Sequence, residues 1–108
     1  MSMTEKQRDI CEAYNWTVRE CENGDIELET YSPKGEDLNL TVYADEDFLK
    51  GIWRLAEEFD IDEHAELWIA GRGKNGIPAS ISAILHDAED IQEMLYELFE
   101  ALKKGAES

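Results

Sequence analysis

The chain has 108 residues and carries 26 Asp and Glu against ten Lys and Arg, which leaves a formal net charge of -16 at pH 7. Nucleic-acid binding requires a basic face and anionic membrane surfaces attract polybasic segments, so this charge argues against direct binding of either. A hydrophobic content of 43%, with three Trp, four Tyr and three Phe, argues against disorder. The length suits a single domain over residues 1–108.

The sequence also predicts a compartment. It holds no run of about 18 apolar residues that would form a transmembrane helix. Its first residues do not combine a basic region with an apolar stretch, as a secretory signal does. Cys11 and Cys21 are the only cysteines, too few for a disulfide framework. We therefore expect a cytoplasmic protein with two free thiols.

The first 44 residues predict one helix followed by three strands. Thr4 is a suitable N-cap for a helix over residues 4–14. Apolar and polar residues then alternate, as in half-buried strands, over residues 15–22, 26–31 and 38–44. Asn23-Gly24 favours a type I′ turn between the first two strands, so the strands are expected to form an antiparallel meander.

From Asp45 onward the apolar period becomes helical. Asp45 is a suitable N-cap for a helix over residues 46–59, and Asp62 for a short helix that ends near residue 70. The apolar stripe of the first of these helices consists of Phe48, Ile52, Leu55 and Phe59, widened by Leu49 and Trp53. We expect Trp53 in the core, together with Trp16, Trp68, Phe48, Phe59 and Phe99. A Trp exposed at a partner surface would instead be an interface anchor.

A glycine-rich loop at residues 71–78 precedes the last helical region. The apolar residues there recur at steps of three and four, in the order Ile81, Ile84, Ala88, Ile91, Leu95, Leu98 and Leu102. Asp87 suggests that the helix restarts there after a kink, and Gly105 suggests that the helix ends there. The predicted fold is α+β: an N-terminal helix, a three-stranded antiparallel meander, then three to four helices packed on one sheet face, in the order αβββααα.

Acidic residues concentrate in the second half of the chain. Glu89, Glu93, Glu97 and Glu100 recur at helical spacing without an intervening Lys or Arg, and Asp87 is expected on the same outer side of the helix. Like charges four residues apart destabilise a helix by a few tenths of a kcal/mol per pair. One interpretation is a solvated face that keeps the protein soluble. The other is a surface that imitates DNA, which carries one charge per about 1.7 Å of axis.

Two further patterns are weaker indications of a binding site. Residues 71–76 match GxGxxG, but a dinucleotide site requires that pattern between a strand and a helix of a βαβ unit. Arg72 and Lys74 in this loop stay candidates for contacting a phosphate or the chain's own acidic surface. Residues 60–64 alternate carboxylates with an imidazole, but they fail the EF-hand template. We expect no catalysis, no cofactor and no metal.

A resemblance covers roughly residues 48–102. It is carried by Phe59-Asp60, the acidic stretch that follows, Trp68, Gly76-Ile77-Pro78, Asp87-Ala88-Glu89 and the Leu-rich helix. This part of the chain resembles short acidic uncharacterised proteins encoded on phages and integrative elements of gut Firmicutes. The resemblance implies a mobile-element setting, where small acidic proteins include antirestriction and anti-CRISPR inhibitors. It implies no catalytic residues.

The sequence thus predicts a non-catalytic module that binds a basic protein surface, in its sharpest form a DNA mimic that occupies the groove of a nucleic-acid enzyme. The carboxylates expected to stand in for phosphates belong to Asp60, Asp62, Glu63, Glu66, Glu89, Glu93, Glu97 and Glu100. The alternative is a structural or adaptor protein that forms a homodimer through the Leu-rich helix, with its charge serving solubility only. A third class is a small hydrolase or metal protein built on residues 60–64.

Overall fold

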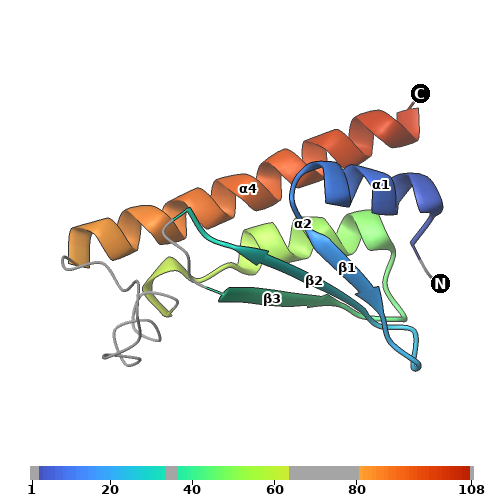
Figure 1. Cartoon of the computed structure of the whole chain (residues 1–108), viewed down its shortest axis with the longest axis horizontal. Coiled ribbons are helices and arrows are strands. Elements are labelled where there is room, and N and C mark those ends of the chain that lie inside the picture. Colours follow the sequence, from blue (N-terminus) through green and yellow to red (C-terminus); the bar gives the residue numbers. More distant parts are fainter. Residues whose placement is uncertain (1–2, 34–36, 64–80, 108) are drawn as a thin grey trace.

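The computed structural model describes residues 3–33, 37–63 and 81–107 (Figure 1). Its elements, in chain order, are α1 (Glu5–Ala13), β1 (Thr17–Glu20), β2 (Ile26–Tyr31), β3 (Asp37–Val42), α2 (Phe48–Glu58) and α4 (Ile81–Glu107). Residues 61–63 are also helical. This order confirms the predicted α+β class. Most of the short helix predicted from Asp62, and the whole glycine-rich loop, lie outside the described residues.

The strands form an antiparallel sheet in the order β1-β2-β3, which confirms the predicted meander. Val18 of β1 pairs with Leu28 of β2, and Leu28 pairs with Leu40 of β3. Because side chains alternate along a strand, these three residues share one face of the sheet. Glu27 and Glu29 lie on the opposite face, so the sheet has one apolar side and one acidic side.

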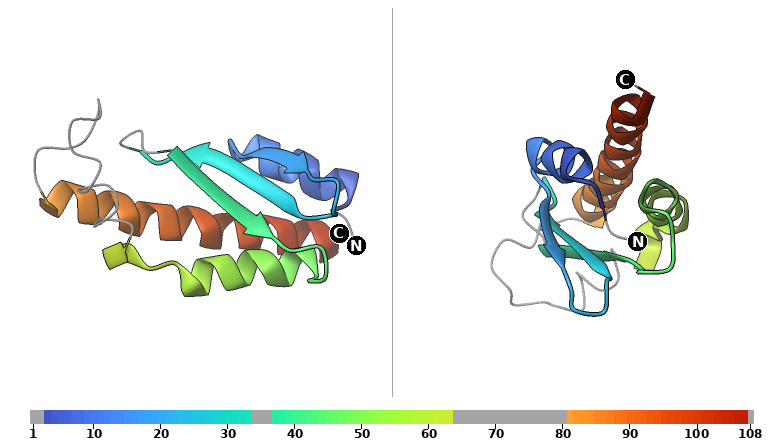
Figure 2. Two further views of the ribbon diagram at one scale, coloured as in Figure 1. Left: turned by 90° about the horizontal axis from the view of Figure 1, so that it is seen from below. Right: turned by 90° about the vertical axis from the view of Figure 1, so that its right-hand side faces the viewer.

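The helices form a layer on the apolar side of the sheet (Figure 2). α1 packs against β1, α2 packs against β3, and α4 lies between the two helices and contacts both. α4 and α2 run in opposite directions (Figure 1). This arrangement buries one side of α4 along its whole length and leaves the other side at the surface of the molecule.

The buried side of α4 is the predicted apolar stripe. Each of its described members is at most 3% exposed: Ile84, Ala88, Ile91, Leu95, Leu98 and Leu102. Ile91, Leu95, Leu98 and Leu102 share one core with Trp16, Leu28 and Ile52. Leu95, Leu98 and Leu102 therefore serve the chain's own core, whereas Leu85 is partly exposed. The dimer of the adaptor alternative stays a prediction.

The connection between β1 and β2 is not the predicted type I′ turn. That turn requires a positive φ at both central residues, but of Asn23 and Gly24 only Gly24 has one, at 94°. Cys21 N–H donates to Asp25 O at 2.8 Å, and Gly24 N–H donates to Cys21 O at 2.9 Å. The result is a three-residue loop with Gly24 as a left-handed bulge residue. Asn23 Oδ1 accepts from Asp25 N–H at 3.0 Å, which favours this longer turn.

The N-terminus of α2 also differs from the prediction. Its N-cap is Asp47, whose carboxylate accepts the N–H of Lys50 at 3.1 Å. Asp45 is not the cap because the residues around it form a turn of their own. Glu46 N–H donates to Tyr43 O at 3.1 Å, and the Glu46 carboxylate accepts from Tyr43 N–H at 2.9 Å.

α4 is one uninterrupted helix, so the predicted restart at Asp87 and the predicted end at Gly105 are both wrong. Asp87 is only 1% exposed and faces inward, not outward as expected. At Gly105 a Cβ atom would lie 2.6 Å from Ile10 Cδ1. The glycine therefore allows α1 to approach α4 closely, and the helix continues past it to Glu107.

Candidate functional site

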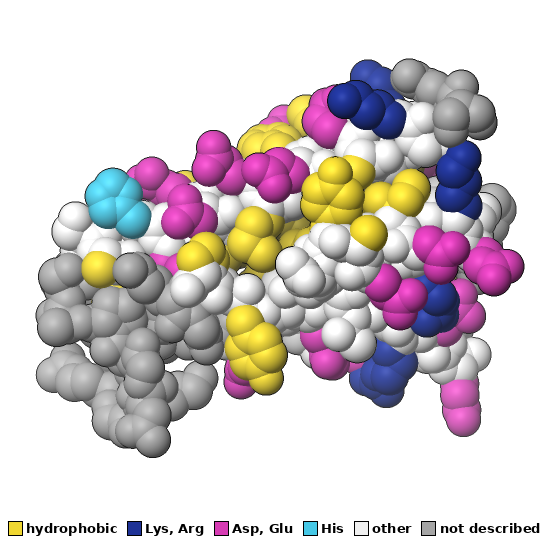
Figure 3. All heavy atoms as spheres, turned by 45° about the horizontal axis from the view of Figure 1, so that its top comes forward, with side chains coloured by type: hydrophobic (Ala, Val, Ile, Leu, Met, Phe, Trp, Pro, Cys, Tyr) yellow, Lys and Arg dark blue, Asp and Glu magenta, His cyan; other side chains and the backbone are white. Residues whose placement is uncertain are grey.

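The most distinctive surface is the outer side of α4. All four glutamates predicted from the sequence, Glu89, Glu93, Glu97 and Glu100, are exposed there, and we call them the acidic stripe. Acidic side chains gather along this helix, with Lys and Arg confined to its C-terminal end (Figure 3). The sequence has no Lys or Arg between residues 81 and 102. His86 lies beside the first of these glutamates, with its Nδ1 4.0 Å from a Glu89 carboxylate oxygen.

The acidic stripe is dense as well as continuous. Residues 89 to 100 cover about 16 Å of helix at about 1.5 Å per residue. Asp90 is exposed beside the stripe, so five carboxylates fall within this length, about one per 4 Å. A single DNA strand carries one phosphate per about 3.4 Å. The outer side of α4 therefore approaches the linear charge density of one nucleic-acid strand.

Four carboxylates outside the acidic stripe are paired with arginine: Glu20, Glu27, Glu46 and Glu58. Arg19 forms an ion pair with Glu27 across the β1–β2 pair, and Arg8 lies 3.9 Å from Glu20. Arg54 donates two hydrogen bonds to Glu46, at 2.7 and 3.1 Å. These bonds lower the pKa of the Glu46 carboxyl and keep it ionised. The acidic stripe differs from these four positions because its part of α4 holds no Lys or Arg.

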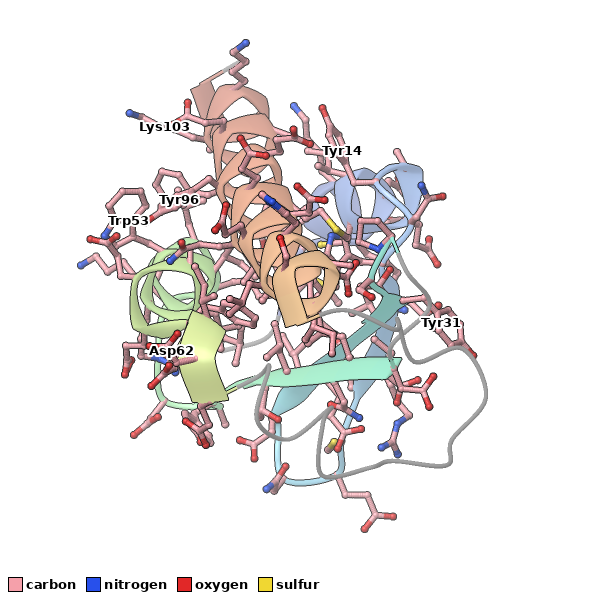
Figure 4. All side chains as sticks on the ribbon, turned by 90° about the vertical axis from the view of Figure 1, so that its left-hand side faces the viewer. Tyr14, Tyr31, Trp53, Asp62, Tyr96 and Lys103 are labelled. Carbon is pink, nitrogen blue, oxygen red and sulfur yellow. The ribbon has the colours of Figure 1, made fainter. Side chains whose placement is uncertain are left out.

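The other predicted carboxylates do not join the acidic stripe. Asp60, Asp62 and Glu63 follow the C-terminus of α2, where they line shallow hollows with Leu55, Phe59 and neighbouring residues of β3. Asp62 lies on the other side of α2 from Trp53 (Figure 4). Asp60 Oδ1 accepts the N–H of Glu63 at 2.9 Å, so the cap of this helical turn is Asp60, not Asp62 as predicted.

Three further candidates fall outside the described residues: Glu66, Arg72 and Lys74. The same is true of His64, on which the metal hypothesis depends. Over residues 3–33, 37–63 and 81–107, no three His, Cys, Asp or Glu side chains are grouped so as to hold a metal ion. The described part of the predicted binding set is thus the acidic stripe on α4 and a separate acidic group after α2.

The sequence reasoning missed a partly exposed aromatic cluster next to the acidic stripe. The cluster consists of Trp53, Tyr96 and Phe99. Trp53 was expected in the core, yet it is 42% exposed. Its ring meets Tyr96 edge-on at a centroid distance of 5.6 Å and Phe99 at 4.8 Å. The signal was its position: Trp53 follows Ile52, so it lies about 100° around the helix from the buried stripe.

Two shallow hollows connect the aromatic cluster to the acidic stripe. The first, of about 450 Å³, lies between α2 and α4 and is lined by Leu49, Lys50, Trp53, Phe99, Glu100 and Lys103. The second, of about 530 Å³, is lined by Tyr14, Glu93, Tyr96, Glu97, Glu100, Ala101 and Lys104. Figure 4 shows Trp53 and Tyr96 on the α2 side of α4 and Tyr14 on the α1 side. Glu100 lines both hollows, so apolar and acidic groups form one continuous surface.

One hydrogen bond fixes the aromatic cluster in place. Tyr96 OH donates to Glu57 Oε2 at 2.5 Å and joins α4 to α2. This bond raises the pKa of the Tyr96 hydroxyl, because the neutral phenol is the form that donates. Gln92 Nε2 donates to Ala56 O at 2.9 Å one turn away. The two helices are therefore held in one register beneath the cluster.

The thiols and the helices add two findings. Cys11 is fully buried and burial raises the pKa of its thiol to about 12, while Cys21 is partly exposed; both cysteines are free. Even α4, at 27 residues, lacks an apolar stretch of the kind that crosses a bilayer, as does every other helix in the described chain.

Comparison of this chain with known proteins found no relative. The resemblance to acidic proteins of phages and integrative elements stays a prediction, because neither a protein-family model nor a curated protein nor a solved structure matches this chain.

Proposed function

We propose that the protein is a non-catalytic cytoplasmic module that binds a basic protein surface through the acidic stripe of α4. In the most specific form of this proposal it occupies the basic groove of a nucleic-acid enzyme and excludes DNA, as antirestriction and anti-CRISPR inhibitors do. The observation that carries the proposal is the stripe itself: four exposed glutamates on one side of a helix that has no Lys or Arg from residue 81 to residue 102.

Energetics favour recognition over solubility as the reason for the stripe. Glutamates at i and i+4 repel each other and destabilise a helix by a few tenths of a kcal/mol per pair. Solubility needs net charge, which residues elsewhere already supply, and it does not need like charges in a row. A basic groove that normally holds phosphates gains from a row of fixed anions. Its binding should weaken steeply as salt increases, because screening and counterion release both oppose it.

The test is retention of host proteins on the immobilised chain. At about 0.05 M NaCl we expect the wild-type chain to retain a DNA- or RNA-processing enzyme, and at about 0.5 M NaCl to release it, because the Debye length falls below about 5 Å. Glu93→Gln with Glu97→Gln should reduce the retention at low salt by at least about tenfold, since both side chains lie in the middle of the stripe.

A matched control separates the stripe from net charge. Glu22→Gln with Asp45→Asn removes the same two charges from exposed loop positions away from α4. This control variant should retain the enzyme as the wild-type chain does. Equal retention by the stripe variant and the control variant would contradict the proposal, provided that neither variant melts below the wild-type temperature.

A further inference from the structure

We propose that the aromatic cluster of Trp53, Tyr96 and Phe99 is the anchor site for an apolar side chain on a cationic amphipathic helix of the partner protein. This inference rests on the proposed function, because it identifies the kind of segment that the acidic surface binds. It assigns the two components of the surface different tasks. The carboxylates attract and orient the segment, and the aromatic rings hold it.

The exposure of Trp53 is the first argument. A tryptophan side chain buries 150–250 Å² in a core or an interface, so leaving 42% of Trp53 in water forgoes part of that stabilisation. Leu49 and Phe99 border the same hollow. A partly buried apolar hollow that includes an exposed Trp resembles the centre of a binding interface, where Trp and Tyr dominate the energy.

The second argument is that the cluster is already ordered. Trp53 rests against two rings, and Tyr96 is held by its hydrogen bond to Glu57. Side chains that are fixed before binding lose little conformational entropy when a partner arrives. A loosely packed surface aromatic would lose side-chain conformational freedom on being immobilised, which weakens binding.

The charges around the cluster define the chemistry of the occupant. Glu57 lies beside Tyr96, and Glu100 lines both hollows. Farther along α4, Glu93 and Glu97 continue the acidic surface. Lysines or arginines on either side of an apolar residue would meet these carboxylates while the apolar residue enters the hollow. A helix that presents both kinds of side chain at i, i+3, i+4 and i+7 fits this pattern.

Three lysines at one end give the surface a direction. Lys50 and Lys103 line the Trp53 hollow, and Lys104 lines the neighbouring one. Basic residues of the partner are therefore attracted by the carboxylates along α4 toward Glu89 and are repelled by the lysines near Lys103. An acidic group or a carboxyl terminus of the partner suits the lysine end.

A second copy of the chain is a poorer occupant. Each chain carries a formal charge of -16, and a pair of stripes would place like charges against each other in the same interface. Nucleic acid is opposed for the same reason. A cationic segment is the occupant whose charge complements Glu93, Glu97 and Glu100, which line the neighbouring hollow beside Tyr96.

The inference is tested with two synthetic helical peptides of about 18 residues. The first consists of Lys and Leu, with Leu at i, i+3, i+4 and i+7. The second has Gln in place of every Leu, so it keeps the charge and loses the apolar anchor. The dissociation constants of both labelled peptides are measured by fluorescence anisotropy against the folded full-length chain.

The wild-type chain should bind the Leu peptide at least about tenfold more tightly than the Gln peptide. Trp53→Ala should bring this ratio close to one and leave the Gln-peptide affinity within about twofold of the wild-type value. Trp53→Phe, which keeps an aromatic ring, should have an intermediate ratio. Tyr31→Ala, a control that removes an aromatic side chain 68% exposed on the sheet, should keep the wild-type ratio.

An unchanged ratio in both Trp53 variants overturns the inference. So does sedimentation that shows a wild-type dimer dissociated by Trp53→Ala, since the occupant would then be a second copy. A failure of the proposed function would be recognised by a different result. In that case the variant Glu93→Gln with Glu97→Gln would bind the Gln peptide as tightly as the wild-type chain does. The two ideas are therefore separated by which peptide and which variant changes.

Discussion

Gly51 shows how one missing side chain sets the distance between α2 and the sheet. A Cβ atom on Gly51 would lie 2.6 Å from Val42 Cγ1 and 3.2 Å from Glu46 Cδ. Gly51→Ala should therefore destabilise the protein by up to about 2 kcal/mol, because overpacking costs about 1–3 kcal/mol and the gain in helix propensity offsets about 1 kcal/mol of this cost. Urea denaturation followed by far-UV circular dichroism measures this loss.

The close contact between Gly51 and Val42 predicts that a substitution of Val42 partly compensates for Gly51→Ala. Val42→Ala removes the methyl groups that the new Cβ would meet, so it should cost less in the Gly51→Ala background than in the wild-type chain. Stabilisation by Gly51→Ala alone, as expected for an exposed helical glycine, would contradict this account of the α2–β3 contact.

At the scale of elements, Arg54 connects α2 to β3 and to the turn before α2. Its guanidinium donates to Glu46, donates to Thr41 O at 3.0 Å and lies 5.2 Å from the centre of the Tyr43 ring. Arg54→Ala should cost about 1–2 kcal/mol, as typical for a charge-assisted, partly buried hydrogen-bond set. Arg54→Lys should recover only part of this, because an ammonium cannot reproduce the paired geometry. Denaturant titration of the three proteins at pH 7 measures both differences.

The same contact predicts a pH dependence. The folded-state pKa of Glu46 lies below its ordinary value of 4.5, so its contribution to stability is present above pH 4.5 and is lost as the pH falls through the lowered folded value. The difference in stability between the wild-type chain and Glu46→Gln should therefore shrink as the pH falls from 7 through this range. A difference that stays constant from pH 7 down to about pH 2 would show that Glu46 is not ionically coupled to Arg54.

At the scale of the whole molecule, a net charge of -16 works against the compact state. Raising NaCl from about 0.01 M to about 1 M shortens the Debye length from about 30 Å to about 3 Å. The melting temperature should rise by several degrees, since about 1 kcal/mol corresponds to about 4–8 °C in a domain of this size. The rise should be smaller for Glu93→Gln with Glu97→Gln, which relieves part of the repulsion. A wild-type melting temperature that is unchanged or lower at high salt would contradict this account of the charge repulsion.

Local sequence patterns predicted much of this fold. Alternation along β2 placed Ile26 and Leu28 inside, and the period of α4 placed Leu95 and Leu98 in the core. Patterns failed where several local solutions compete. Asp45 and Asp47 are both good N-caps by type, and the choice between them depends on the turn that Glu46 forms with Tyr43.

The candidate site was predictable only in part for the same reason. Helical spacing alone places the four glutamates of the acidic stripe together, because neighbours on one helix need no tertiary information. Whether Asp60 and Asp62 join that stripe depends on how α2 packs against α4, and local spacing does not contain that information. The exposure of Trp53 likewise follows from the packing of α4 against α2, which covers Ile52 and leaves the next residue at the edge.

The central claim is that the acidic stripe takes the place of DNA phosphates on a basic protein, and a competition titration tests it most directly. Labelled duplex DNA is bound to the enzyme retained from host lysate, and the chain is added at low salt. The wild-type chain and Glu22→Gln with Asp45→Asn should displace the DNA at the same concentration, and Glu93→Gln with Glu97→Gln should require at least about tenfold more. Displacement by the stripe variant at the wild-type concentration, or binding of the wild-type chain without loss of DNA, would contradict the claim.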